Sequence, residues 1–408
     1  MRRRVKVIAV AATVVVAAAA AGAWATSAGD PGVSSKAILV GGTFPLSGTA
    51  SLYGTIPKAE AAYFQWFNAN SSIHGRKIDF KVVDDGYDPS QTVPLTRQLV
   101  EQDRVFAIFG SLGTAPNLAI RSYLNQRKVP QILIATGDSY WGAQYKRYPW
   151  TIGYQPDYPG EGIIYGKFIR AKVPQAKIGV LMQNDAYGKN YLDGLKKGLG
   201  KAQSKIVDVE PFDVTAPDVT QQIVKLKASG ANVFMDFATP SPSIKALVTA
   251  FKFGWRPTIF VNNVSASPTF MRTAAKAAGN AAVEGAISTT YVKDPNDPAQ
   301  ANDPGVKLFK AIMAKYYPGG DVLNTNNIYG MSVAWTLIYA LKHTANPPTR
   351  KGILRALTHM NTKANPFLYK GIVLKTSSGD HFPIEQQILV RWQGDRFHPF
   401  GHLFNHAR

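Results

Sequence analysis

The sequence predicts an α/β protein made of two similar lobes, each built on a parallel, doubly wound sheet. First, short apolar runs alternate with amphipathic segments of helical period along most of the 408 residues, as in strands joined by crossover helices. Second, this alternation is interrupted once, at residues 141–161, by a segment rich in aromatic residues, Pro and Gly, and then restarts. Because 408 residues suffice for two domains of ordinary size, we expect a lobe boundary in that segment.

The first block begins at residue 37. Its expected elements are a strand at 37–44, a helix from Pro57, a strand at 77–83, a helix at 90–102, and the strands that open the stretches 106–117 and 129–139. Each of these two stretches is an apolar run followed by a turn of Gly, Ser and Thr. Free N–H groups and hydroxyls at a helix N-terminus after such a turn suit an anion or carboxylate. Adjacent turns of a parallel sheet would face one cleft.

The second block repeats the first in kind, and a helical part and a short tail follow it. The expected elements are helices at 161–171, 187–201, 218–228, 243–253 and 267–278, alternating with strands at 177–182, 205–210, 232–238, 258–263 and 281–290, then helices at 306–316, 327–343 and 351–360, and strands near 371–374 and 386–392. The three helices after the second block need a sheet to cover. We expect them to cover the sheet of the first lobe.

The first 25 residues have the composition of a secretory signal peptide. A basic head with four Arg and Lys residues precedes an apolar run, and Ala23 and Ala25 form a small-x-small cleavage site. The alternative is an uncleaved anchor, because an apolar run of about 19 residues just spans a bilayer. Residues 26–35 then form a linker rich in small residues. Either way, we expect the main body to work outside the cytoplasm, in the periplasm or cell envelope.

Charge and cysteine content narrow the class of protein further. The formal charge is +20, and +16 remains without the four basic residues of the first 25 positions. Lys and Arg are scattered, which favours a solvated surface near an anionic envelope over a nucleic-acid partner. The chain has no Cys, which excludes disulfides, thiolate metal sites, a nucleophilic thiol and a lipid-bearing cysteine.

We find no catalytic constellation, and the sequence predicts neither an enzyme nor a metal or cofactor site. Nucleophile-elbow, zinc-protease, phosphate-loop and dinucleotide-binding motifs are absent. The paired acids Asp84 and Asp85 are better explained by a strand end and turn. His398, His402 and His406 have helical spacing, but Pro399 and Gly401 argue against a helix, so we expect a frayed tail.

Seven motifs give the chain a likeness to a known family. It resembles the extracytoplasmic solute-binding proteins of branched-chain amino-acid-type ABC transporters, the leucine/isoleucine/valine-binding-like group. The motifs run from about residue 37 to 392: FPLSGTASLYGT, VVDDGYDPSQTV, IFGSLGTAPN, VPQILIATG, YPWTIGYQPDY, MQNDAYGKNY and SGDHFPIEQQILVRWQ. No single motif is decisive, but their order and spacing together are specific.

The resemblance implies a type I periplasmic binding fold, with two Rossmann-like doubly wound lobes joined by three crossover strands. Lobe 1 would comprise 36–153 and 287–362, and lobe 2 would comprise 154–286 and 363–408. Crossings would fall near 153–156, 286–290 and 361–370. A monomer of this kind closes about a hinge on a small carboxylate or amino acid and delivers it to a membrane permease. The alternative is a sensing subunit of the same fold coupled to a receptor.

The resemblance also implies a set of ligand-binding residues. Tyr53 would line the cleft, and Thr114 would hold the ligand carboxylate through its hydroxyl. The other implied positions are Ala135, Thr136 and Gly137 beside Thr114, and Tyr187, Ala238 and Asn263 from the second lobe. Each has a plainer alternative: the threonines as helix caps, the tyrosines as packing residues, and Asn263 as part of a turn.

Asn263 stands where amino-acid binders place an acidic residue against the ligand ammonium, and Ala238 where the family often has a larger, aromatic one. A buried ammonium without a carboxylate partner keeps its desolvation cost of several kcal/mol. The sequence therefore favours an aromatic or aliphatic carboxylate over an amino acid, with Tyr140, Trp141 and Tyr154 as further candidates near the cleft. The alternative is that Asp236 supplies the missing acid.

Overall fold

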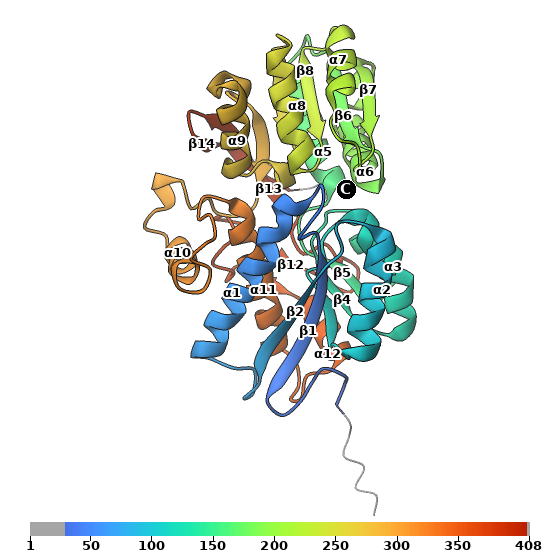
Figure 1. Ribbon diagram of the computed structural model, residues 1–408, viewed down its shortest axis with the longest axis vertical. Coiled ribbons are helices and arrows are strands. Elements are labelled where there is room, and N and C mark those ends of the chain that lie inside the picture. The colour runs from blue at the N-terminus through green and yellow to red at the C-terminus, as the bar shows by residue number, and fades with distance from the viewer. Residues whose placement is uncertain (1–28, 406–408) are drawn as a thin grey trace, which may run out of the picture.

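The chain folds into two lobes that lie one above the other (Figure 1). A computed structural model describes residues 29–405. The predicted signal peptide, or anchor, lies outside the described residues. The described part contains no helix long and apolar enough to cross a membrane.

The lower lobe in Figure 1 is built on a five-stranded parallel sheet of order β2-β1-β3-β4-β5. Its strands are β1 Ala37–Phe44, β2 Lys77–Asp84, β3 Ala107–Phe109, β4 Gln131–Ile134 and β5 Thr151–Gly153. The last three of these strands are short and fully buried, as expected of a parallel sheet covered on both faces.

The upper lobe is built on a seven-stranded sheet of order β14-β13-β10-β9-β8-β6-β7. Its strands are β6 Ile178–Gln183, β7 Ile206–Phe212, β8 Val233–Phe237, β9 Thr258–Val261, β10 Ile287–Thr290, β13 Gln386–Gln393 and β14 Arg396–Asn405. Its five parallel strands repeat the order of the lower sheet, and β13 and β14 add an antiparallel edge. The two doubly wound lobes confirm the predicted fold class.

Helices cover both sheets. They are α1 Thr55–Asn70, α2 Pro89–Arg97, α3 Thr114–Arg127, α4 Tyr140–Ala143, α5 Tyr158–Lys172, α6 Ala186–Leu199, α7 Thr220–Ala228, α8 Pro240–Lys252, α9 Pro268–Ala278, α10 Pro304–Tyr316, α11 Thr325–Lys342 and α12 Arg350–Leu357. Short turns of 3₁₀ or π helix lie at Ser51–Gly54, Gln98–Gln102, Gly200–Lys205, Asn263–Ser265, Asn280–Ala282 and Pro298–Gln300.

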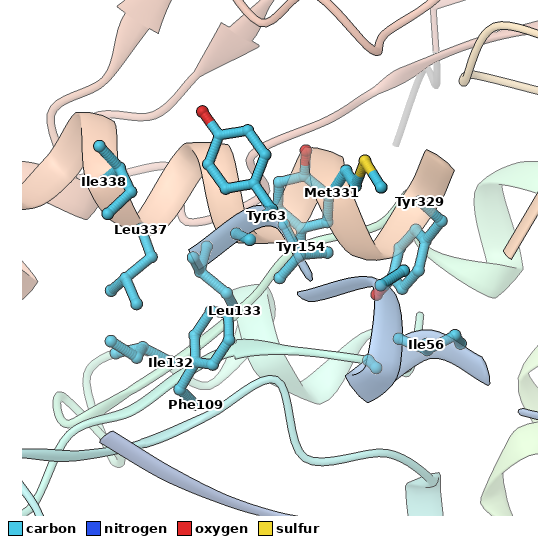
Figure 2. Packing of buried hydrophobic residues seen from close by; sticks show 14 of the residues in the cluster. Ile56, Tyr63, Phe109, Ile132, Leu133, Tyr154, Tyr329, Met331, Leu337 and Ile338 are labelled. Carbon is cyan, nitrogen blue, oxygen red and sulfur yellow. The ribbon is translucent and has the colours of Figure 1, made fainter. Parts of the chain in front are cut away.

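The helices after the second block cover the first sheet, as predicted. Figure 2 shows the layer between them: Leu337 and Ile338 of α11 lie above the sheet residues Ile132 and Phe109. Most of α11 is buried, which explains why it is apolar on nearly all faces rather than along one stripe.

Two segments lie in the other lobe from the one to which we had assigned them. Residues 287–290 form β10, which pairs with β9 and β13 of the upper sheet rather than with the lower lobe. Phe367, Leu368 and Ile372 pack in the core of the lower lobe. A short antiparallel pair, β11 Asn361–Thr362 and β12 Leu374–Lys375, precedes the return of the chain to the upper sheet at β13. The last crossing therefore falls between 375 and 386.

The expectation of a frayed tail was wrong. Residues 396–405 form β14, which pairs antiparallel with β13 from Gln386 opposite Asn405 to Gln393 opposite Arg396, with a register shift between Ile388 and Leu389. Two of the three histidines, His398 and His402, lie on this strand, and the third lies outside the described residues.

Candidate functional site

A cavity lies between the lobes, where the strand order reverses in each sheet. Loops that leave neighbouring strands at such a point diverge and open a crevice at the carboxyl ends of the strands. Tyr53 and Gly113 line the cavity from the loops after β1 and β3, and Tyr187 and Thr239 line it from those after β6 and β8. The cavity offers about 80 Å³ to the centres of water-sized spheres, which is room for several waters or a small solute.

The structure brings the sequence-predicted residues to this one region. Four of them line the cavity: Tyr53, Ala135, Tyr187 and Asn263. The other four are one or two positions from a lining residue: Thr114, Thr136, Gly137 and Ala238. Tyr140, Trp141 and Tyr154 do not line it, because Trp141 lies under Arg121 and the Tyr154 hydroxyl bonds Ser332 in the lower core. The role of the eight residues in binding stays a prediction.

The N-terminus of α3 begins at the cavity wall, directly after the lining residue Gly113. Gly113 precedes the helix with a φ of 103° and has no side chain to cap it. In the first turn, the Thr114 N–H donates to the Tyr87 hydroxyl, and Pro116 has no N–H. Thr114 Oγ1 lies 2.5 Å from Thr136 Oγ1, so the two predicted turns meet through their hydroxyls. The helix dipole and the two hydroxyls can hold a carboxylate without a cationic side chain.

The cavity wall is rich in tyrosine and carries no basic group. Seven tyrosines line it: Tyr53, Tyr87, Tyr158, Tyr187, Tyr291, Tyr329 and Tyr369. Among the described lining residues there is no Lys, Arg or His. Burial raises the pKa of Tyr53 and of Tyr187 well above the ordinary value, so these phenols remain neutral donors. Such a wall fits an apolar or aromatic body with a few polar groups.

Tyr187 lines the cavity and has a hydroxyl that makes no hydrogen bond within the described part of the protein. Its ring meets that of Tyr158 edge to face, with centroids 5.0 Å apart. Its hydroxyl is buried and has no hydrogen-bond partner among the described residues. A buried hydroxyl without a hydrogen-bond partner lowers the stability of the folded protein by about 1–3 kcal/mol. A ligand atom that forms a hydrogen bond with it would recover that free energy.

Asn263 is held by a buried carboxylate that the sequence analysis missed. The backbone N–H of Asn263 donates to Glu161 Oε1 at 2.8 Å, and Asn263 Nδ2 donates to Glu161 Oε2. Glu161 lies in the first turn of α5 and is 1% exposed. The two residues are 102 positions apart, so only the fold brings an acid behind the position where the family resemblance expects one.

Asp236 does not reach the cavity. It is fully buried in β8, where Ser243 Oγ donates to Oδ2 and Oδ1 has no hydrogen-bond partner in the described chain. Burial raises the pKa of Asp236 to about 7. Its absence from the cavity lining argues against the alternative that it pairs with a ligand ammonium.

Several lining residues escaped the sequence analysis. Gln155 and Tyr158 follow β5, inside the aromatic segment from which we had named only Trp141 and Tyr154 as candidates near the cleft, and Tyr87 lies in the turn after β2. Tyr158 also joins the two lobes, because its N–H donates to the Gly137 carbonyl at 2.7 Å while its ring stacks on Tyr191. Within residues 29–405, no cluster of three or more His, Asp or Glu side chains is arranged to hold a metal ion.

The fold and the interlobe cavity define a two-lobed solute-binding protein. Residues 37–396 match the periplasmic binding protein family, and the chain belongs to it. This family is non-enzymatic, in agreement with the prediction that the chain is not an enzyme.

Individual relatives are distant. A Leu/Ile/Val-binding protein homolog 2 of Brucella abortus (strain 2308) is 25% identical over 203 residues, which are 50% of this chain and 54% of that protein. The chain thus spans about half the length of the curated relatives it matches.

Two solved structures show the same fold at lower identity. A branched chain amino acid ABC transporter protein from Thermus thermophilus with bound valine has a TM-score of 0.80 and 18% identity, over 92% of this chain and 98% of that one. A fatty acid ABC transporter substrate-binding protein from Thermomonospora curvata has a TM-score of 0.76 and 20% identity, over 92% of this chain and 94% of that one.

Proposed function

We propose that this protein is the extracytoplasmic substrate-binding component of an ABC importer and that it captures a small carboxylate-bearing solute between its lobes. The observation that carries the proposal is the cavity at the facing reversal points of the two sheets, with the N-terminus of α3 at its wall. The carboxylate would bind at α3, beside Thr114 and Thr136, and the tyrosine wall would receive the rest of the molecule.

Capture by hinge closure follows from where the lining residues come from. Tyr53 and Gly113 belong to one lobe, and Tyr187 and Asn263 to the other, so a ligand touches all four only when the lobes are closed. A ligand that binds the closed form more tightly shifts the population toward it. The closed form would then dock on a membrane permease. Transport rather than receptor-coupled sensing is proposed because the named relatives in Thermus and Thermomonospora are ABC transporter proteins.

A thermal-shift screen tests the ligand class. The panel contains aliphatic and aromatic carboxylates, amino acids, and a neutral amide of each acid as its matched control. We expect an acid at 100 times its dissociation constant to stabilise the protein by about 2.7 kcal/mol, and its amide to do little, because the amide lacks the anionic end. Equal shifts from acids and amides would refute carboxylate recognition.

Tyr187→Phe tests the contribution of the second lobe. Because the hydroxyl has no partner among the described residues, we expect the free energy of unfolding to stay unchanged or to rise by about 1 kcal/mol. Affinity for the acid found in the screen should fall about tenfold, since one hydrogen bond to the ligand is lost. Calorimetric titration of the wild type and the variant measures this, and an unchanged affinity would place the ligand away from Tyr187.

A further inference from the structure

We propose that Glu161 is a specificity-determining positioning residue: it orients Asn263 so that the Asn263 amide oxygen accepts a hydrogen bond from an ammonium group beside the ligand carboxylate. The inference rests on the proposed function and names its substrate class, an α-amino acid. In the sequence, Asn263 looks like a neutral residue without an acid nearby, which disfavours an amino acid as ligand. In the structure, Glu161 is hydrogen-bonded to Asn263 and supplies that acid.

Neutral hydrogen-bond donors surround the buried Glu161 carboxyl group. Donors point at its two oxygens: the Tyr165 hydroxyl at 2.5 Å, the Tyr191 hydroxyl at 2.8 Å, and both nitrogens of Asn263. Burial raises the pKa of Glu161, and these donors oppose that rise because they favour the ionised form. None of them carries a charge, and no salt bridge to Glu161 is found between residues 29 and 405. When Glu161 is ionised, its negative charge has no counter-charge among the described residues.

Asn263 is fixed at two points by this carboxylate. A carboxylate accepts hydrogen bonds and donates none, so the side chain of Asn263 must turn its nitrogen toward Glu161. The remaining polar atom of the side chain, Oδ1, accepts no hydrogen bond from the described chain, and Asn263 lines the cavity. The ligand thus meets a fixed acceptor.

The surroundings favour a cationic donor at that acceptor. A carboxylate hydrogen-bonded to the amide polarises it and makes its oxygen a stronger acceptor. The cavity wall near Asn263 also includes the aromatic rings of Tyr158 and Tyr187. Because no Lys, Arg or His stands among the described lining residues, nothing in the wall repels a positive charge. The acid that the family resemblance expects at position 263 is supplied by Glu161, directly behind it.

Glu161→Gln tests the charge with matched ligand pairs. The probes are leucine with 4-methylpentanoate and phenylalanine with 3-phenylpropanoate, which differ within each pair only by the amino group. We expect the wild type to prefer the amino acid in each pair, and Glu161→Gln to lower that preference at least tenfold with little change for the des-amino acid. A purely structural role would weaken both members equally. An unchanged preference in Glu161→Gln, or a wild type that prefers the des-amino acids, would overturn the inference.

The same substitution at a second buried glutamate is the control. Glu60 is fully buried in α1 of the other lobe, and neither of its side-chain oxygens has a partner in the described chain. Glu60→Gln should leave the preference within each pair unchanged. Loss of preference there as well would show that the effect at Glu161 is nonspecific.

A ligand-free measurement separates this inference from the proposed function. The single substitution Asn263→Asp places a second carboxylate against Glu161 and should lower the melting temperature. Combined with Glu161→Gln, the same substitution should lower it much less, because an amide at position 161 can donate to a carboxylate at position 263 and so restores the hydrogen bond in the reverse direction. Equal destabilisation by Asn263→Asp with and without Glu161→Gln would refute the orientation of Asn263. If none of the four acids binds, the assignment of an α-amino acid fails, while the wider thermal-shift screen decides the proposed function and the melting temperatures decide the positioning role.

Discussion

Asp236→Asn is expected to raise the free energy of unfolding at pH 8 by up to about 4 kcal/mol. Asp236 is fully buried, and its pKa is raised from 3.8 to about 7. Each unit of pKa shift corresponds to about 1.4 kcal/mol of difference between the two protonation states. A shift of this size at a single group is large compared with the stability of a domain.

The direction of the pH dependence follows from the raised pKa. The folded protein holds the Asp236 proton up to about pH 7, and the unfolded chain releases it near pH 4, so the wild type loses stability as pH rises between these values. The amide has no proton to release. The gain from Asp236→Asn should therefore be complete above pH 7 and absent below about pH 4.

Urea denaturation of both proteins at pH 4 and pH 8 measures this gain, and ligand titration gives the accompanying control. Because Asp236 does not line the cavity, the substitution should leave ligand affinity unchanged. A gain that is equal at the two pH values would show that the carboxyl group is not protonated by burial. A collapse of affinity for amino acids would instead identify Asp236 as the acid that pairs with the ligand.

The fold could be predicted because its signals are local. The buried strand Ala37–Phe44 is largely an apolar run, and strands β3 and β4 each end at a turn of Gly, Ser or Thr. Elements whose partners lie far along the chain were harder to assign. Strand β10 has four residues and is anchored in the upper sheet by β13, which returns beside it. Strand β14 contains Pro399 and Gly401, which weaken a strand pattern, but pairing with β13 overrides that preference.

In the candidate site, too, the residues marked by local sequence signals could be predicted, and those that depend on distant contacts could not. Each predicted residue follows the carboxyl end of a strand, so its position could be inferred from the strand pattern and the resemblance. Glu161 could not, because a glutamate in the first turn of a helix is ordinarily a solvated residue favoured by the helix dipole. Its burial and its contact with Asn263 arise only from the packing of α5 against α6 and the upper sheet.

Gly113→Ala is expected to lower ligand affinity at least 100-fold. Gly113 has a φ of 103°, which an L side chain rarely adopts, and a Cβ there would lie 2.6 Å from Cε2 of Tyr87. Tyr87 is buried in the cavity wall, and its hydroxyl bonds Gln183 of the other lobe. The added methyl group must displace this ring, so it disturbs both the cavity wall and the contact that closes the lobes.

Gly254→Ala separates this clash from backbone strain. Gly254 also has a positive φ, 73°, but a Cβ there meets no atom within 4 Å. Both substitutions should cost about 1–2 kcal/mol of stability through the backbone, and Gly113→Ala a further 1–3 kcal/mol through overpacking. Only Gly113→Ala should abolish binding in a calorimetric titration. If both variants bind normally, the turn before α3 is not the carboxylate site, because the displaced Tyr87 ring would otherwise disturb that site.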